Sequence, residues 1–338
     1  MIIKKLGLAV FASVLAASVS SARADDFTWK TLTIRVGTTV GGGFDNYARL
    51  LARHIGEFLP GKPNVIVENR PGAGGMIAFN YLYNIAPKDG TEIASSAPGL
   101  LLDRLIYQDK SNAKYDAVRF QAIGSMTQDF SVFIVRTKSG LNLDDVMKGK
   151  TYNVGTAGPG GNPEIYGRAL NSLLKTKLKL VAGYPGMAQV QMAMESAELD
   201  GIPGVPWADL YAQKRAWFTD GFATPILQYR IERSPQLKDV PTVLELTSDD
   251  SYKEAFTVLM MREEISRPFL APPDTPKDRV ATLRTAFEQS MKSQSMIDEA
   301  KRMSVSIDWL PGDKVDEIVR KMTTPSEKTA GYIRDIFN

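Results

Sequence analysis

Two glycine-rich segments constrain the fold of this sequence more than any other feature. The first, residues 38–45, follows the β-branched run 32–36, and a stripe of apolar residues at helical spacing comes directly after it. The second, residues 156–163, also follows a β-branched run and precedes a helix expected over 163–174. Repeated strand–loop–helix units are typical of α/β folds. We therefore expect an α/β protein.

The same alternation continues along the chain. Besides 32–36, strands are expected at 65–67, 91–95, 132–135, 152–154 and 178–181. Further helices are expected at 76–85, 187–198, 276–292 and 312–321. From Thr224 the chain is punctuated by proline before the last two of these helices. The length suggests two domains.

The amino-terminal residues indicate secretion. Two lysines at positions 4 and 5 precede an almost unbroken apolar run at 6–16, and Ala-Arg-Ala at 22–24 fits a secretory cleavage site. The run is too short to span a bilayer, which disfavours an amino-terminal membrane anchor. We predict a signal peptide over 1–24, cleaved after Ala24, and a periplasmic mature protein.

Composition excludes several classes of function. The formal net charge is +3, and it becomes 0 once the three basic residues of the signal peptide are removed. A neutral mature chain gives no argument for binding nucleic acid or an anionic membrane. The chain has no Cys, so neither a lipoprotein anchor nor a disulfide framework is available. The mature protein therefore depends on its hydrophobic core for stability.

The two glycine-rich loops have the chemistry of an anion site. Glycine lets a ligand approach the backbone closely, and the first N–H groups of the following helix have no partner within it. In the second loop, Asn162 is a good N-cap and Pro163 fits the first helical position. Two such loops facing each other across a cleft would hold one carboxylate-bearing molecule from both sides. The alternative is that the glycines only permit tight turns.

Nucleotide binding and enzymatic catalysis find little support. Neither loop contains a Gly-Lys-Ser/Thr sequence or the G-x-G-x-x-G spacing of dinucleotide sites. His54, the single His, falls on the apolar stripe of the first helix and is interpreted as a packing residue. A zinc site would need further His or Cys ligands, and no G-x-S-x-G motif is present. We expect no catalytic residues, no metal and no cofactor.

Three other residues leave alternatives open. Asp45 lies just inside a helix start, where its carboxylate either favours the helix dipole or contacts a ligand-bound water. Trp207 is either an aromatic wall of the cleft or ordinary packing, and we favour the cleft because Gly and Pro surround it. Arg70 precedes a Pro-Gly turn and is expected to stabilise that turn rather than contact ligand.

One motif identifies a family resemblance. The segment Val67–Gly75, with the run E-N-R-P-G-A-G-G, resembles the signature of the substrate-binding proteins of tripartite tricarboxylate transporters, the Bug (TctC-like) family. The resemblance covers essentially the whole mature chain in order. Further segments similar to the family's motifs are Gly41–Arg49, Ala86–Gly90, Asp239–Val243 and Ala271–Pro276.

The resemblance implies a two-lobed periplasmic binding protein of the Venus-flytrap, type II-like kind, each lobe a mostly parallel sheet flanked by helices. One lobe would comprise residues 25–124 plus 224–338, and the other residues 125–223. The chain would cross between them near 124–127 and 222–228. The cleft between the lobes would hold the ligand.

The resemblance also implies the binding residues. Family members hold the substrate carboxylate mainly through backbone N–H groups of the two loops. Together with polar and aromatic neighbours, the expected ligand-binding residues are Thr38, Val40, Gly41, Gly42, Phe44, Asp45, Ser95, Ser96, Ala157, Gly158, Gly160, Gly161, Asn162, Glu164 and Trp207.

The chain departs from the family pattern at several positions. Phe44 stands where the family usually has a small polar residue, and Glu164 stands where many relatives have His. The segment 204–210 differs from the usual short strand. Phe44 and Trp207 favour a ligand with an apolar or aromatic body, and Glu164 disfavours a tricarboxylate. The ligand class stays open among dicarboxylates, tricarboxylates, amino acids and aromatic acids.

The implied function is non-enzymatic. A monomeric periplasmic protein would capture a small organic carboxylate and deliver it to a two-component membrane permease. One alternative is a ligand-binding partner of a periplasmic sensor, which sequence alone does not separate from uptake. A secreted hydrolase or isomerase is the other alternative, and the lone His and missing nucleophile motif argue against it.

Overall fold

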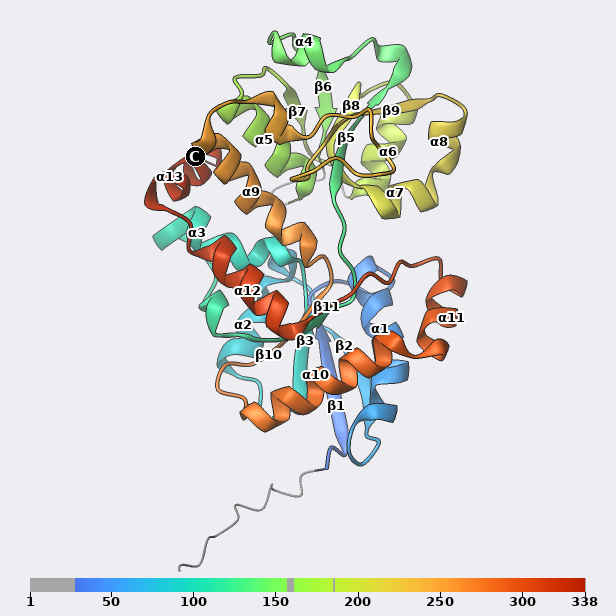
Figure 1. Ribbon diagram of the computed structural model, residues 1–338, viewed down its shortest axis with the longest axis vertical. Coiled ribbons are helices and arrows are strands. Elements are labelled where there is room, and N and C mark those ends of the chain that lie inside the picture. The colour runs from blue at the N-terminus through green and yellow to red at the C-terminus, as the bar shows by residue number, and fades with distance from the viewer. Residues whose placement is uncertain (1–27, 157–160, 185, 338) are drawn as a thin grey trace, which may run out of the picture.

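The molecule has two halves, each built around a β-sheet (Figure 1). The structure is a computed structural model that describes residues 28–156, 161–184 and 186–337. The expected signal peptide and the expected site residues Ala157, Gly158 and Gly160 lie outside the described residues. In the part of the chain that is described, no helix has both the length and the apolar character needed to cross a bilayer.

The first sheet has six strands in the order β11-β4-β10-β3-β1-β2. β1 pairs in parallel with both β2 and β3, whereas β10 lies antiparallel between β3 and β4. The strand β11 pairs antiparallel with β4 at the sheet edge. The bounds of these strands are β1 Thr31–Val36, β2 Asn64–Asn69, β3 Glu92–Ser95, β4 Gln121–Ser125, β10 Pro268–Ala271 and β11 Leu310–Pro311.

Apolar residues on one face of β1 explain its place inside the first sheet. Leu32, Ile34 and Val36 are fully buried, and the apolar stripe of α1 packs in the same cluster. The helix α1 contacts β1, β2 and α10. The helices connecting or covering this sheet are α1 Gly43–Ile55, α2 Met76–Asn84, α3 Asp103–Tyr107, α10 Lys277–Lys292, α11 Gln294–Arg302 and α12 Gly312–Thr323.

The second sheet has five strands in the order β7-β6-β8-β5-β9. β6 pairs in parallel with β7 and β8, whereas β5 pairs antiparallel with β8 and β9. Its strands are β5 Ser131–Arg136, β6 Asn153–Gly155, β7 Lys179–Val181, β8 Gly201–Pro206 and β9 Ala223–Gln228. The associated helices are α4 Leu143–Met147, α5 Asn162–Leu173, α6 Met187–Glu195, α7 Trp207–Gln213 and α8 Arg215–Thr219.

The α/β class and the two-sheet architecture expected from the sequence are confirmed. The sheets themselves are mixed rather than mostly parallel, because β10 and β11 in one and β5 in the other run antiparallel to their neighbours. Of these antiparallel strands, β10 and β11 come from chain segments that return to the first sheet after the second sheet has been formed. A βα pattern read along the sequence does not reveal such returning strands.

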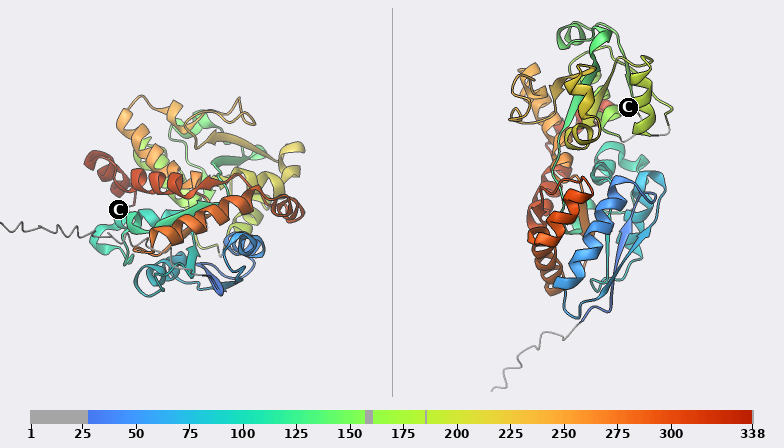
Figure 2. Two further views of the ribbon diagram at one scale, coloured as in Figure 1. Left: turned by 60° about the horizontal axis from the view of Figure 1, so that its bottom comes forward. Right: turned by 90° about the vertical axis from the view of Figure 1, so that its right-hand side faces the viewer.

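Several segments join the two halves (Figure 2, right). The chain passes from β4 to β5 through residues 126–130, and it returns through α9, Asp250–Glu264, to β10. The second crossing was expected near residues 222–228. In the structure this segment contains β9, an edge strand of the second sheet. The last helix, α13 Glu327–Phe337, contacts α5, α9 and α3. The division into lobes at residues 125 and 223 stays a prediction.

Candidate functional site

Strand direction places the starts of α1 and α5 at the ends of the two sheets that face each other. In the first sheet β1, β3 and β4 run in the same direction. The loop after β1 therefore lies at the same end of the strands as residues 126–130, through which the chain leaves this sheet. In the second sheet β5 runs opposite to β6 and β8, so the end of β6 at Gly155, and with it the start of α5 beside Gly204, lies where this crossing enters the sheet. The carboxyl ends of parallel strands are where α/β proteins bind ligands.

Loop one, residues 38–45, leads into a helix start that no side chain caps. The N-cap of α1 is Gly42, which makes no side-chain hydrogen bond to the helix, and Gly41 adopts the left-handed backbone conformation with φ of 84°. Val40, at the tip of the loop, is 70% exposed. The first N–H groups of α1 therefore face a region where an anion can accept their hydrogen bonds.

Asp45 fixes the shape of loop one from inside. Its side chain is buried, and one carboxylate oxygen accepts hydrogen bonds from the Gly41 N–H at 2.8 Å and from Arg49 Nε at 2.9 Å. Burial acts to raise the pKa of this carboxyl, but its bonds with Arg49, Gly41 and Asn69 outweigh burial and lower the pKa. Of the two roles left open by the sequence, the observed contacts of Asp45 are structural.

The motif E-N-R-P-G-A-G-G supports loop one. Asn69 Nδ2 donates to the Thr38 carbonyl at 2.9 Å and to the second Asp45 oxygen at 2.8 Å. The Arg70 guanidinium lies 3.8 Å from the centroid of the Tyr81 ring, on the helix that follows the motif. Arg70 thus stabilises the turn, in agreement with the sequence analysis. Within this motif, Asn69 therefore holds loop one in its conformation, and Arg70 holds the turn that follows β2.

The end of β3 adds buried hydroxyls beside this loop. Ser95 and Ser96 are fully buried, and their Oγ atoms, like Thr38 Oγ1, have no hydrogen-bond partner among the described residues. A β-carbon at Gly37 or at Gly75 would overlap Ser96 Oγ, so both glycines make room for this serine. A buried unpaired hydroxyl is unfavourable by about 1–3 kcal/mol. A ligand or a water molecule that reached these hydroxyls would relieve that cost.

At the end of loop two, the start of α5 differs from the prediction that Asn162 caps this helix. The N-cap of α5 is Gly161 and not Asn162, and Gly161 makes no side-chain capping bond. Asn162 is the first helical residue, because its side chain turns away to donate to Ser131 Oγ of β5 at 2.8 Å. The helix α5 thus also begins without a side-chain cap, as α1 does.

Close packing holds the start of α5 in place. A β-carbon at Gly204 of β8 would lie 2.8 Å from both the Asn162 carbonyl oxygen and Tyr166 Cδ2. The Tyr166 ring stacks on Tyr229 with centroids 3.7 Å apart, and its hydroxyl donates to Glu263 of α9. The proline- and glycine-rich strand β8, whose last residues begin the segment 204–210 that departs from the family pattern, therefore supplies a bare strand backbone for the helix start.

Glu164 does not present a free carboxylate at this helix start. It is buried and accepts a hydrogen bond from Arg168 Nε at 2.5 Å, one turn further along α5. The negative charge is thereby paired within the helix.

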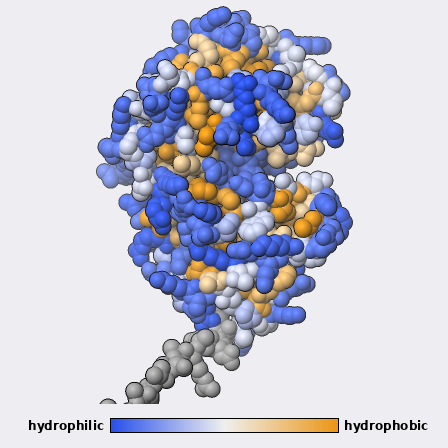
Figure 3. All heavy atoms as spheres, viewed as in Figure 1, coloured by the Kyte–Doolittle hydropathy of each residue, from blue (hydrophilic) through white to orange (hydrophobic). Residues whose placement is uncertain are grey.

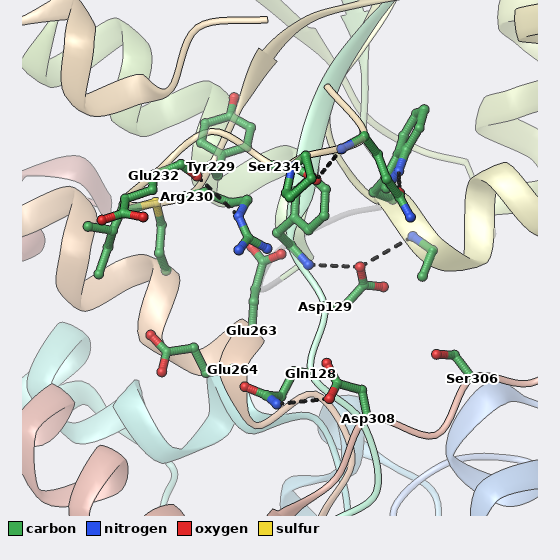
Figure 4. A pocket seen from close by; sticks show the side chains of 17 residues that line it. Gln128, Asp129, Tyr229, Arg230, Glu232, Ser234, Glu263, Glu264, Ser306 and Asp308 are labelled. Carbon is green, nitrogen blue, oxygen red and sulfur yellow. Dashed lines mark hydrogen bonds between the residues drawn. The ribbon is translucent and has the colours of Figure 1, made fainter. Parts of the chain in front are cut away.

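A cavity of about 680 Å³ lies between the two halves, beside the crossing segment. Figure 3 shows the molecule hollowed between its halves, and Figure 4 shows the side chains that line the cavity. Among the expected site residues that the structure describes, only Trp207 lines it. Trp207 is largely buried, packs against Tyr211 and Phe218, and donates to Gln236 Oε1 at 2.7 Å. Loop one and the start of α5 are therefore separate from this cavity.

Acidic groups dominate the titratable lining of the cavity. Asp129, on the crossing segment, accepts hydrogen bonds from the Phe130 N–H at 2.7 Å and the Ala208 N–H at 3.2 Å. Burial raises the pKa of Asp129 to about 7 against these two bonds. Through its hydrogen bond with the Ala208 N–H, Asp129 stabilises the first turn of α7. The other acidic lining residues are Glu232, Glu263, Glu264 and Asp308.

Phe44 and a residue that the sequence analysis missed form a second part of the site. The Phe44 ring is half-buried, and the Arg267 guanidinium lies 4.8 Å from its centroid. Arg267 also donates to Asp209 Oδ2 at 3.1 Å. No sequence pattern connects these residues, which are far apart along the chain. Phe44 is thus engaged by a side chain of the protein itself.

His54 connects two helices through both of its ring nitrogens. Its Nε2 lies 2.7 Å from Glu299 Oε2 and its Nδ1 lies 3.2 Å from Ser295 Oγ, so it joins α1 to α11. Among the described residues, no three His, Cys, Asp or Glu side chains gather in a way that could hold a metal ion.

Known proteins resemble this chain over most of its length. No family model matches it. It is 25% identical over 337 residues to a UPF0065 protein of Bordetella pertussis (strain Tohama I), covering 97% of this chain and 96% of that one. It is 24% identical over 301 residues to a UPF0065 protein from the tcbD-tcbE intergenic region of Pseudomonas sp. strain P51, covering 86% and 83%.

Solved structures share the fold. A TctC solute binding protein from Polaromonas without ligand superposes with a TM-score of 0.68 at 20% identity, covering 91% of this chain and 97% of that one. MatC from Rhodopseudomonas palustris with bound malate gives 0.63 at 19% identity, covering 91% and 99%. An R. palustris protein with adipate gives 0.64 at 18% identity, covering 90% and 97%.

Proposed function

We propose that this chain captures a small organic carboxylate between its two sheets. The premise is its resemblance to the Bug (TctC-like) substrate-binding proteins, which is confirmed along most of its length. In this proposal the protein works in the periplasm and passes its ligand to a two-component membrane permease. Two structures of the same fold hold malate and adipate, both small carboxylates.

One observation carries the proposal. Both α1 and α5 begin at a glycine N-cap without a side-chain hydrogen bond, and both starts lie at the sheet edges that face each other. A helix start with unpaired N–H groups and positive partial charge favours an anion. Two opposed starts would bind one carboxylate-bearing molecule from both sides.

Ligand binding would then couple to movement of the two halves. A molecule that contacts both α1 and α5 binds the closed arrangement more tightly than the open one, and it shifts the population toward the closed form. The permease would recognise that closed form. No bond of the ligand is broken in this mechanism, and we assign the protein no catalytic activity.

A thermal-shift screen of residues 25–338 against mono-, di- and tricarboxylic, amino and aromatic acids tests the proposal. A ligand at about 100 times its Kd adds about 2.7 kcal/mol to the free energy of unfolding. This raises the Tm by several degrees in a protein of this size. A shift with at least one carboxylate is expected. If ligand-free protein responds to none of the panel, carboxylate capture is wrong.

The variant Gly42→Val locates the site. Gly42 has φ of −77°, and an added β-carbon would make only ordinary contacts, the nearest at 3.6 Å from the Thr39 carbonyl oxygen. The valine side chain would shield the first N–H groups of α1. We expect the ligand-induced shift to be lost while the ligand-free protein stays folded. The control Gly331→Ala, in α13, should keep the full shift.

A further inference from the structure

Arg267 occupies a fixed position at the junction of the two halves. It precedes β10, its backbone N–H donates to Ser125 Oγ at 3.2 Å, and its carbonyl accepts from the Met126 N–H at 3.1 Å. Both partners lie where the chain leaves β4 for the second sheet. The backbone of Arg267 is therefore anchored to the first half, at the edge that faces the second.

The guanidinium of Arg267 lies against the start of α1. It stands 4.8 Å from the centroid of the Phe44 ring and 5.1 Å from that of the Tyr47 ring. A β-carbon at Gly43, the first residue of α1, would lie 3.2 Å from Nη2 and 3.8 Å from Nε. Loop one and Arg267 thus form one packed unit, and glycine at 43 permits the close approach.

The opposite half supplies the counter-charge. Arg267 Nη2 donates to Asp209 Oδ2 at 3.1 Å, and Asp209 lies on α7, which follows β8 of the second sheet. The side chain of Arg267 is 15% exposed and that of Asp209 is 40% exposed. The pair therefore spans the two halves without involving any ligand.

Electrostatics favours the arrangement in which this bond is made. A positive guanidinium beside the start of α1 is unfavourable, because the helix dipole also places positive charge there. Asp209 offsets that charge only while the two halves are close together. Parting the halves would leave the Arg267 charge without its partner from the second half.

We propose that Arg267 is a positioning residue that couples loop one to the second half of the molecule, and that its bond with Asp209 sets how closely the halves approach before ligand binds. This inference rests on the proposed function, because it concerns the same closing movement. The bond favours a partly closed arrangement with the start of α1 already facing the second half. A ligand then completes the closure.

A distance measurement across the cleft tests this directly. The chain has no Cys, so Ile85→Cys and Met192→Cys, at positions 70% and 61% exposed on opposite halves, accept spin labels. In ligand-free protein, Asp209→Asn should shift the distance distribution toward longer values. An ion pair of this exposure changes such an equilibrium by about two- to fivefold. The carboxylate identified by the thermal-shift screen should restore the short distance.

Matched variants separate coupling from general damage. Arg267→Gln should give the same distribution as Asp209→Asn, and the double variant should add nothing further, because both changes remove one bond. Glu317→Gln breaks an exposed pair within α12, where the acid is 41% exposed, and should leave the distance unchanged. If Arg267→Gln does not fold, Asp209→Asn and its control still decide the question.

The outcomes distinguish the two proposals. A wild-type distance that stays the same when a carboxylate is shown by calorimetry to bind would overturn the closing movement itself. A wild-type distance that shortens with ligand, together with an Asp209→Asn distribution identical to the ligand-free wild type, would overturn only the role of the bridge. A Tm of Asp209→Asn close to the wild-type value excludes partial unfolding as the cause of a longer distance.

Discussion

Loop one and the start of α5 present the same bare helix terminus, but they are held in opposite ways. Loop one depends on charge and hydrogen bonds, through Asp45, Asn69 and Arg49. The start of α5 depends on shape, through the close contact of Gly204 with Asn162 and Tyr166. In both cases the capping position itself is left to a glycine.

In both places the backbone N–H groups that would bind an anion are distinct from the side chains that hold the helix start in position. A side chain that capped either helix would occupy the N–H groups that an anion needs. The support is therefore moved to residues that lie beside or beneath the helix start. Loop one should respond to changes of charge and pH, whereas the start of α5 should respond to changes of volume.

The largest effect is expected from Asp45→Ala. The change removes the acceptor for the Gly41 N–H, Asn69 and Arg49, and a buried network that loses one member leaves its other members unpaired. We expect the free energy of unfolding to fall by about 2–3 kcal/mol, measured by urea denaturation. Carboxylate affinity should weaken by about tenfold or more, measured by calorimetry.

The isosteric variant Asp45→Asn tests whether charge is the reason. The pKa of Asp45 is lowered in the folded protein from its ordinary value of 3.8, so its contribution to stability is complete above that pH. The contribution is lost as the pH falls through the folded value. The stability difference between wild type and Asp45→Asn should therefore be present at pH 6 and shrink in acid below about pH 4. A difference independent of pH would mean that shape matters more than charge.

An intermediate effect is expected from Gly204→Ala. The new methyl group would lie 2.8 Å from the Asn162 carbonyl oxygen, which belongs to the backbone and has little room to move. We expect a loss of about 1–3 kcal/mol in the free energy of unfolding, with no dependence on pH between 4 and 8. Gly331→Ala, whose nearest neighbour is 4.0 Å away, is the matched control and should not destabilise. A destabilisation by Gly204→Ala that varies with pH would contradict the comparison.

The smallest effect is expected from Glu164→Gln. Glu164 pairs with Arg168 one turn away, and Arg168 is 44% exposed, so the pair contributes about 0.5 kcal/mol or less. Thermal unfolding should shift by at most a degree or two. The preference among carboxylates should stay the same in the thermal-shift panel. A changed preference would place the Glu164 side chain in contact with ligand.

Much of the fold is predictable from the sequence because its strands and helices have clear periodicity. The strand expected at 32–36 is observed at Thr31–Val36, and the helix expected at 276–292 at Lys277–Lys292. The strands β4, β8, β9, β10 and β11 were missed. All but β4 contain proline, β8 also contains two glycines, and β4 contains a glycine and a single β-branched residue, so neither alternation nor β-branched enrichment marks them.

The site is predictable only where it depends on local sequence. Glycine at the starts of α1 and α5 marks both loops, and the expected role of Arg70 agrees with its stacking on Tyr81. The pairing of Arg267 with Asp209 joins residues 58 positions apart in different halves of the molecule. Asn162 was expected to cap its helix, but a tertiary partner, Ser131, takes its side chain. Tertiary contacts of this kind override local preference.

The place of β10 has a consequence for the order in which the molecule forms. β10 lies between β3 and β4, so Leu270 pairs across a sheet with Ala94 and Ala122. The strands β1, β2 and β3 pair with one another directly, but the six-stranded sheet cannot be completed until β10, a segment made much later in synthesis, has arrived. Contacts between distant parts of a chain slow folding. We therefore expect the first half of the molecule to reach its final structure only late in synthesis.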